Sequence, residues 1–206
     1  MSRFVAGVYD TVMAVSERAC LTAWRAQLLA SAHGTVLEVG AGTGLNLVHY
    51  PAAVQQLIVT EPDPHMAARL HKRMPQHATF LAAGAESLPL PDASVDVVVS
   101  TLVLCTVGDA PAALLEMHRV LRPGGRLLFL EHVGAHDRPD RLKWQRRIEP
   151  VWKHLAGNCH LTRNTEAALV TAGFVLEAIT RESMRKAPPW VRPTIRGVAL
   201  RGVGPG

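Results

Sequence analysis

The sequence predicts an α/β fold in which helices cover a doubly wound, seven-stranded, mostly parallel sheet. Two observations indicate it. Short apolar runs alternate with stretches of helical periodicity, and several of the runs are apolar on both faces, as buried parallel strands require. The 206 residues, 48% hydrophobic and 19% charged, suit a single domain with one full-sized core.

The predicted elements follow in chain order. Residues 1–33 form an N-terminal helical extension, because apolar side chains recur at helical spacing from Phe4 to Ala19. The core, residues 34–133, contains five strands at 35–39, 57–60, 79–82, 95–100 and 126–133, with helices near 64–73 and 110–121. The run RPGG at 122–125 ends the second helix and turns into the last of these strands.

Residues 134–206 complete the domain on the side where an acceptor would bind. A polar, basic connection is expected at 134–147, a helix at 165–172, and strands at 175–179 and 196–201. This part carries the basic excess: from Arg138 onward there are 13 Lys/Arg and 5 Asp/Glu, or +8, whereas residues 1–137 give 9 and 12, or −3. Such a surface could bind an anionic substrate, a membrane or nucleic acid, but a basic surface exposed to solvent is the more common explanation.

Cysteine usage and hydropathy indicate the cellular compartment. The three cysteines, Cys20, Cys105 and Cys159, are odd in number and form no CxxC pair, which argues against a disulfide framework or a structural zinc site. No metal is expected. The sequence has no uncharged apolar stretch of membrane-spanning length, so we expect a cytoplasmic protein.

The most informative segment is VLEVGAGTG at 36–44, an apolar strand that runs into a glycine-rich turn ahead of a helix. Glycines let the backbone approach a ligand closely. The spacing is GxGxG rather than the GxGxxG of dinucleotide sites, with Glu38 two residues before the first glycine. About 20 residues later, Glu61 ends the second strand, where a carboxylate can accept both hydroxyls of a ribose.

These residues resemble the motifs of class I S-adenosylmethionine-dependent methyltransferases, which have a Rossmann-like fold. The runs GAESLP at 84–89, DASVDVV at 92–98 and LRPGG at 121–125 extend the resemblance, which covers residues 36–132. It implies S-adenosylmethionine as the cofactor. The cofactor-binding residues that it implies are Glu38, Gly40, Ala41, Gly42, Gly44, Glu61, Pro62, Ala85, Glu86, Thr101 and Leu102.

The nature of the acceptor is indicated by other segments. The run STLVLC at 100–105 departs from the (D/N/S)PP(Y/F) pattern of enzymes that methylate amino groups of DNA, so we expect a small-molecule acceptor and no nucleic acid. The core resembles the ubiquinone/menaquinone C-methyltransferases. The runs EPVWKH at 149–154 and GNCHLTR at 157–163 resemble the methyltransferase-like alkyl thiol S-methyltransferases.

The second resemblance implies methylation of a small lipophilic thiol or hydrogen sulfide. Methylation at carbon, oxygen or nitrogen of a quinol, phenol or lipid head group is the alternative. Members of the thiol group are membrane-associated proteins with a longer hydrophobic N-terminus, which is missing here, so membrane attachment is not carried over. Peripheral contact with a membrane and the oligomeric state stay open.

Several side chains are candidates for acceptor chemistry. His132 follows the strand end where ligands bind in open α/β sheets, and His160 lies in the thiol-methyltransferase-like run; either could act as an acid, a base or a polarising group. Each could equally bond a backbone carbonyl. Trp144 and Trp152 are expected to wall a lipophilic pocket, with Tyr9 contacting the cofactor or acceptor if the N-terminal helix forms a lid.

Two other classes of function are weighed against methyl transfer. An NAD-dependent oxidoreductase is disfavoured by the glycine spacing and by the lack of a Tyr-x-x-x-Lys pair. A non-catalytic protein that binds S-adenosylmethionine stays open, because the methyltransferase family has no universal catalytic residue.

Overall fold

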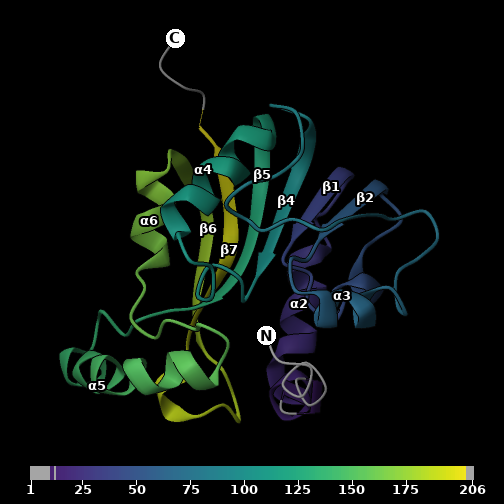
Figure 1. The fold of residues 1–206 in the computed structure, drawn as a ribbon. Coiled ribbons are helices and arrows are strands. Elements are labelled where there is room, and N and C mark those ends of the chain that lie inside the picture. The colour runs from purple at the N-terminus through teal and green to yellow at the C-terminus, as the bar shows by residue number, and fades with distance from the viewer. Residues whose placement is uncertain (1–9, 12, 203–206) are drawn as a thin grey trace.

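The computed structural model describes residues 10–11 and 13–202, and its centre is one seven-stranded sheet (Figure 1). The strand order is β3-β2-β1-β4-β5-β7-β6. Strands β1 to β5 pair in parallel, whereas β7 is antiparallel to both β5 and β6. The strands are β1 (Gly34–Val39), β2 (Val54–Thr60), β3 (Thr79–Leu81), β4 (Val95–Thr101), β5 (Leu121–His132), β6 (Phe174–Ser183) and β7 (Pro193–Arg201). The prediction of a seven-stranded, mostly parallel sheet is confirmed.

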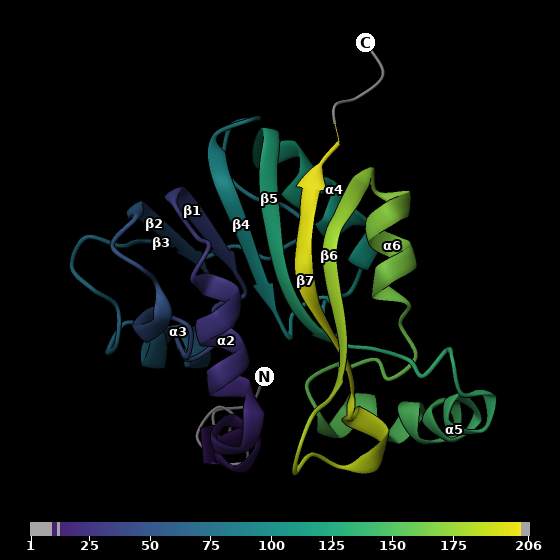
Figure 2. The same cartoon turned by 180° about the vertical axis from the view of Figure 1, so that it is seen from behind.

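Helices cover both faces of this sheet (Figures 1 and 2). The helical elements are η1 (Glu17–Leu21), α2 (Thr22–Leu29), η2 (Leu47–His49), α3 (Pro64–Leu70), α4 (Ala110–Val120), α5 (Pro139–Leu155), α6 (Thr165–Thr171) and η3 (Pro189–Val191). Polar side chains cap three of the helices: Asp63, Asp109 and Asn164 accept hydrogen bonds from backbone N–H groups in the first turns of α3, α4 and α6.

The core consists of two apolar layers, one on each face of the sheet. Neighbouring strand residues alternate between them: Leu37 belongs to the layer that includes α4 and α6, whereas Val36 belongs to the layer that includes α2. Both residues are fully buried, which is why the strands read as continuous apolar runs. None of the described helices is long and apolar enough to cross a membrane.

Two sequence predictions about elements are corrected. Residues 134–147 were expected to form a polar, basic connection, but α5 starts within them at Pro139 and continues for 17 residues. Proline is favoured in a first turn because its missing N–H has no partner there anyway. α4 ends at Val120, directly before the run at 122–125, but this run lies within β5, where the pairing of β4 with β5 shifts register between Val95 and Val97. The glycines and proline of this run therefore form an irregularity in the pairing of β4 with β5, and not a turn between a helix and a strand.

Candidate functional site

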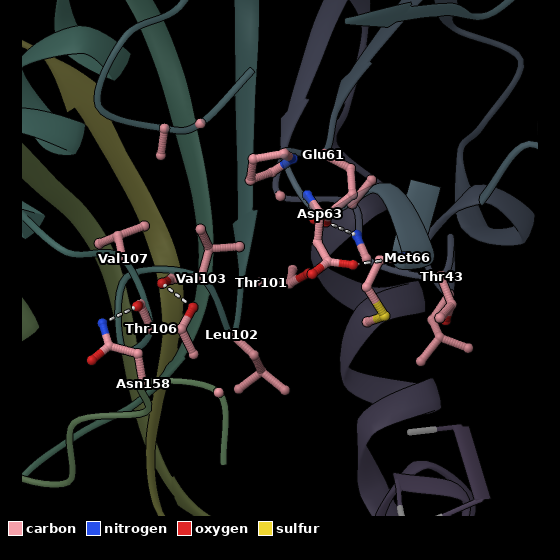
Figure 3. Close-up of a pocket in the computed structure, with 18 of the residues that line it drawn as sticks. Thr43, Glu61, Asp63, Met66, Thr101, Leu102, Val103, Thr106, Val107 and Asn158 are labelled. Carbon is pink, nitrogen blue, oxygen red and sulfur yellow. Dashed lines mark hydrogen bonds between the residues drawn. The ribbon is translucent and has the colours of Figure 1, made fainter. Parts of the chain in front are cut away.

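A cavity of about 510 Å³ lies at the carboxyl ends of β1, β2 and β4. Between β1 and β4 the chain order of the sheet reverses, and this is where open α/β sheets bind ligands. Figure 3 shows Thr43, Glu61 and Met66 on one side of the cavity and Thr106, Val107 and Asn158 on the other. The volume is in the range of small-molecule sites.

The glycine-rich turn forms the wall of the cavity after β1. Gly40 and Gly42 both have φ of +60°, a left-handed conformation that glycine adopts without steric cost. A Cβ at Gly40 would lie 2.8 Å from Cγ2 of Val103, so this position also needs glycine for space. The turn is fixed to β2, because the Ala41 N–H donates to the Thr60 carbonyl at 2.8 Å.

Glu61 lies at the end of β2 and is 7% exposed. Its Oε2 accepts a 2.8 Å hydrogen bond from the Gly42 N–H, and its Oε1 accepts a 2.9 Å bond from the Asp63 N–H. Burial raises the pKa of this carboxyl above its usual value, and the two backbone bonds oppose the rise. Glu61 is thus an acceptor group held rigidly at the cavity wall.

Glu38 lies behind the turn rather than in the cavity lining. Its oxygens accept hydrogen bonds from Asn46 Nδ2 at 2.9 Å and from the Tyr50 hydroxyl at 2.8 Å. Complete burial raises its pKa from 4.5 to about 7, although these two bonds and the charge of Arg25 act against the rise.

Arg25 connects this buried network to the cavity. Its guanidinium donates to Asn46 Oδ1 at 2.9 Å and to Thr101 Oγ1 at 3.0 Å, and it pairs with Glu17 at 3.0 Å. Arg25 is 4% exposed and lines the cavity, yet sequence reasoning missed it because no motif marks a single arginine within a helix. The contact with Thr101 joins α2 to the end of β4.

The loop after β4 forms the floor of the cavity. Leu102 has φ of +60°, which is uncommon for a non-glycine residue and is enriched at active and ligand-binding sites. Buried Glu131 holds this loop: its Oε1 accepts from the Ser100 hydroxyl at 2.8 Å and from the Val103 N–H at 3.1 Å. Burial raises the pKa of Glu131, and those hydrogen bonds oppose the effect.

The far end of the cavity is built from two segments that are distant in sequence. Residues 106–108 follow β4, and residues 156–158 follow α5. Asn158 Nδ2 donates to the Thr106 carbonyl at 2.8 Å, and the His160 N–H donates to the Cys105 carbonyl at 2.7 Å (Figure 3 shows the first bond). Sequence reasoning missed this junction, although Gly157-Asn158 is a common chain-reversal pair.

Nine of the eleven residues expected to bind the cofactor line this cavity. They are Gly40, Ala41, Gly42, Glu61, Pro62, Ala85, Glu86, Thr101 and Leu102. Glu38 and Gly44 lie outside the lining, and the place of Gly44 is structural, since a Cβ there would meet side-chain atoms of Leu47 and Leu70 within 3 Å. Glu86 holds the adjacent wall by accepting a 2.9 Å bond from the Gly108 N–H.

Among the described residues, those expected on the acceptor side are not part of the cavity lining. His132 is buried, with Nδ1 3.8 Å from Cys159 Sγ, and His160 Nδ1 lies 3.8 Å from Glu149 Oε1. Trp152 packs edge-on against Trp190, with ring centroids 5.8 Å apart. Tyr9 lies outside the described residues.

Trp144 also departs from expectation. It is 61% exposed on α5, because the phase of this helix directs the neighbouring Gln145 inward instead. Gln145 is fully buried and bonds the Ala135 N–H at 2.7 Å.

Comparison with known proteins agrees with this geometry. Residues 37–129 match a family model described as a methyltransferase domain. The chain is 43% identical over 178 residues to the thiol S-methyltransferase TMT1B of Rattus norvegicus, an alignment that covers 81% of this chain and 70% of the relative. It is 35% identical over 202 residues to human TMT1A, also a thiol S-methyltransferase, covering 94% and 82% respectively.

Solved structures support the fold independently of sequence. A SAM-dependent methyltransferase from Thermotoga maritima superposes with a TM-score of 0.71 at 21% identity and 97% coverage of both chains. An S-adenosylmethionine-dependent methyltransferase from Mesorhizobium loti gives a TM-score of 0.64 at 22% identity, covering 90% of this chain and 97% of that one. At these identities the likeness shows the fold alone.

Proposed function

Because the chain belongs to the family of the TMT1 thiol S-methyltransferases, we propose that it methylates the sulfur of a small lipophilic thiol or of hydrogen sulfide. The observation that carries the proposal is the composition of the cavity. One end holds the glycine turn and Glu61, and the other end, beyond Leu102, is formed by neutral residues: Val103, Thr106, Val107, Gly108, Ala156, Gly157 and Asn158. A small, uncharged and largely apolar acceptor fits such a surface.

The cofactor is S-adenosylmethionine, and the first end of the cavity fits it. Gly42 lines the cavity and has no side chain, so its backbone can lie close to the amino-acid part of S-adenosylmethionine. Each Glu61 oxygen accepts a backbone bond and retains a lone pair for a ribose hydroxyl. Ala85 and Glu86 lie beside these groups at the place that we propose for the adenine base.

The chain's part in the reaction is to bind, align and exclude water. S-adenosylmethionine supplies an electrophilic methyl group, which an acceptor attacks in line. A thiol with a pKa near 8.5 is already partly ionised at neutral pH, so alignment is the main requirement for methyl transfer. Leu102 and Val103 separate the two ends of the cavity and are placed to set that alignment.

A methyl-transfer assay that detects S-adenosylhomocysteine tests the proposal. Purified protein is given small alkyl and aryl thiols, hydrogen sulfide, quinols, phenols and phosphatidylethanolamine in parallel. We expect product with the thiols and with hydrogen sulfide. Product with a quinol or lipid alone would replace the thiol assignment, and cofactor binding without product across the panel would favour a non-catalytic role.

Resemblance to a quinone enzyme does not favour the alternative acceptors, a quinol, a phenol or a lipid head group. The ubiquinone/menaquinone C-methyltransferase of Rubrivivax gelatinosus is 36% identical over 96 residues, which is 47% of this chain. The TMT1 relatives align over 81–94% of it. The longer alignments must therefore include part of the C-terminal segment that closes the far end of the cavity.

We further propose that the N-terminal segment, of which the structure describes residues 10–11 and 13–33, is a lid over the cavity. Asp10 Oδ1 accepts a 2.6 Å bond from the Thr43 hydroxyl, and its other oxygen pairs with Arg73 at 2.7 Å. Thr43 lines the cavity. Asp10→Asn should therefore speed cofactor dissociation, measured by stopped flow, and an unchanged rate would contradict the lid.

The exposed face of α5 is suited to peripheral contact with a membrane. Trp144, Val151 and Leu155 are 61%, 64% and 70% exposed, and their spacing places them on one side of the helix. The Arg147 guanidinium lies 5.8 Å from the centre of the Trp144 ring. We expect co-sedimentation with anionic vesicles that Trp144→Glu abolishes; equal sedimentation of both proteins would refute it.

A further inference from the structure

Three buried side chains that the mechanism above does not use meet behind the far wall of the cavity. Cys105 follows β4, His132 is the last residue of β5, and Cys159 follows α5. Their relative exposures are 3%, 1% and 9%. One ligand atom from each, a sulfur or a ring nitrogen, lies within 4.8 Å of the other two.

The separations suit coordination of a single ion. Zinc binds cysteine sulfur at about 2.3 Å and histidine nitrogen at about 2.0–2.1 Å, so tetrahedral geometry places neighbouring ligand atoms roughly 3.5–3.8 Å apart. The distance from Cys159 Sγ to His132 Nδ1 is 3.8 Å. Small side-chain rotations would bring all three atoms to coordination distance.

The imidazole of His132 gives a second observation. Its Nε2 is buried and has no hydrogen-bond partner among the described residues, and its Nδ1 faces only the cysteine sulfur at 3.8 Å. A buried ring with such weak partners is costly, since burying a polar group without a strong partner opposes folding. A bond from Nδ1 to a metal ion would give that nitrogen a strong partner, while Nε2 would carry the ring proton.

The position of the cluster gives the ion a structural task. The neighbours of Cys105, residues 106–108, and of Cys159, residues 156–158, form the far end of the cavity. An ion between the two sulfurs would hold these segments together, alongside the backbone bond from the His160 N–H to the Cys105 carbonyl.

We propose that Cys105, His132 and Cys159 bind one Zn²⁺ ion, which clamps the two segments of the far cavity wall and leaves its fourth coordination position to an external ligand such as water. Cysteine thiolates and histidine nitrogens are typical zinc ligands in proteins, whereas magnesium, calcium and manganese prefer oxygen ligands. Sequence spacing argued against a zinc site because the ligands come from three separate elements instead of a CxxC motif. The proposal does not depend on which acceptor the enzyme uses.

Metal binding by the full chain tests the proposal directly. Protein freed of metal with a chelator under reducing conditions is titrated with Zn²⁺, and bound metal is counted by mass spectrometry. We expect one ion per chain and a higher Tm. Loading with Co²⁺ should give thiolate-to-cobalt charge-transfer bands and the intense d–d bands of a tetrahedral site. Absence of both bands from the wild-type protein would overturn the proposal, whatever the variants do.

Single substitutions assign the ligands. Cys105→Ser, Cys159→Ser and His132→Gln should each weaken zinc binding by more than the roughly 10–100-fold that loss of an outer-shell group costs. Cys20→Ser is the matched control, because Cys20 is also buried but lies on η1, outside the cluster. It should keep one zinc and the zinc-dependent rise in Tm. Circular dichroism verifies that each variant is folded.

Two results would overturn the site. One is that the variants of Cys105 and Cys159 bind zinc as tightly as the wild-type protein does. The other is thiol titration of zinc-free, unreduced protein that finds one free thiol where the sequence has three cysteines, together with no zinc uptake after reduction. That result would mean that two cysteines form a disulfide, and Cys105 and Cys159 are the two whose sulfurs lie within 4.8 Å of each other.

Discussion

The carboxylate of Glu61 accepts a 2.8 Å hydrogen bond from the backbone N–H of Gly42, which ties the end of β2 to the glycine turn after β1. A turn residue with positive φ is thus held by the acid proposed to receive the ribose of the cofactor. Substituting either residue should alter both the shape of the turn and the binding of the cofactor, and suitable controls separate the two effects.

Glu61→Gln should weaken S-adenosylmethionine binding by about 10–100-fold, which corresponds to roughly 1.4–2.7 kcal/mol. Both oxygens of Glu61 accept a backbone bond, one from Gly42 and one from Asp63. Glutamine has one acceptor oxygen, so one of these two N–H groups would face the amide NH2 and lose its acceptor. Isothermal titration calorimetry measures the affinity. Glu177→Gln, an exposed acid on β6, is the control and should bind normally. Equal affinities for the two variants would remove Glu61 from the cofactor site.

Gly42→Ala should lower cofactor affinity at least tenfold, because the added Cβ strains a residue with φ of +60° and enters the cavity. Gly124→Ala is a matched control: it has φ of +74°, and its Cβ would meet no atom within 4 Å. Both substitutions should lower the free energy of unfolding by about 1–2 kcal/mol. If the control loses as much affinity as Gly42→Ala, general destabilisation explains the effect.

The sequence was sufficient for the parts of the site that one segment supplies. The glycine turn and Glu61 each follow a continuous apolar strand, so their meeting at one sheet edge could be predicted from βαβ order. The antiparallel β7 was recognised as a strand, although its insertion between β5 and β6 is seen only in the structure.

The rest of the site depends on packing between distant segments, which no local pattern reports. Arg25 reaches the cavity because of how α2 packs on the sheet, and Asn158 does so because α5 carries the chain back to the loop after β4. His132 illustrates the same limit: it follows the strand end where ligands were expected, but its Nδ1 lies 3.8 Å from Cys159 Sγ and it is outside the cavity lining.

Arg25→Met should lower the free energy of unfolding by about 3–5 kcal/mol, because it leaves Glu17 and Asn46 without their buried partner. Urea denaturation measures this loss. Arg126→Met removes an exposed ion pair with Glu177 and should cost no more than about 1 kcal/mol. The double variant Arg25→Met/Glu17→Gln should recover part of the loss. No recovery would show that Glu17 is not the charge left unpaired.

Glu38→Gln should make the protein more stable than the wild type at alkaline pH, by an amount that depends on pH. The folded state raises the pKa of Glu38 from 4.5 to about 7, so the folded protein binds this proton more tightly than the unfolded chain. Stability from this group is complete below pH 4.5 and is lost as pH rises through 7. The advantage of the variant should therefore widen by roughly 2–3 kcal/mol between pH 5 and pH 8.

Glutamine is the appropriate replacement because a protonated Glu38 accepts from Asn46 Nδ2 with one oxygen and can donate to the Tyr50 hydroxyl with the other. The amide reproduces both bonds, so the two proteins should have nearly equal stability at pH 4. Other buried acids, such as Glu131, titrate in both proteins and cancel in the difference. Urea denaturation at four pH values measures the gap, and a gap that is constant from pH 4 to pH 8 would mean that Glu38 is ionised throughout.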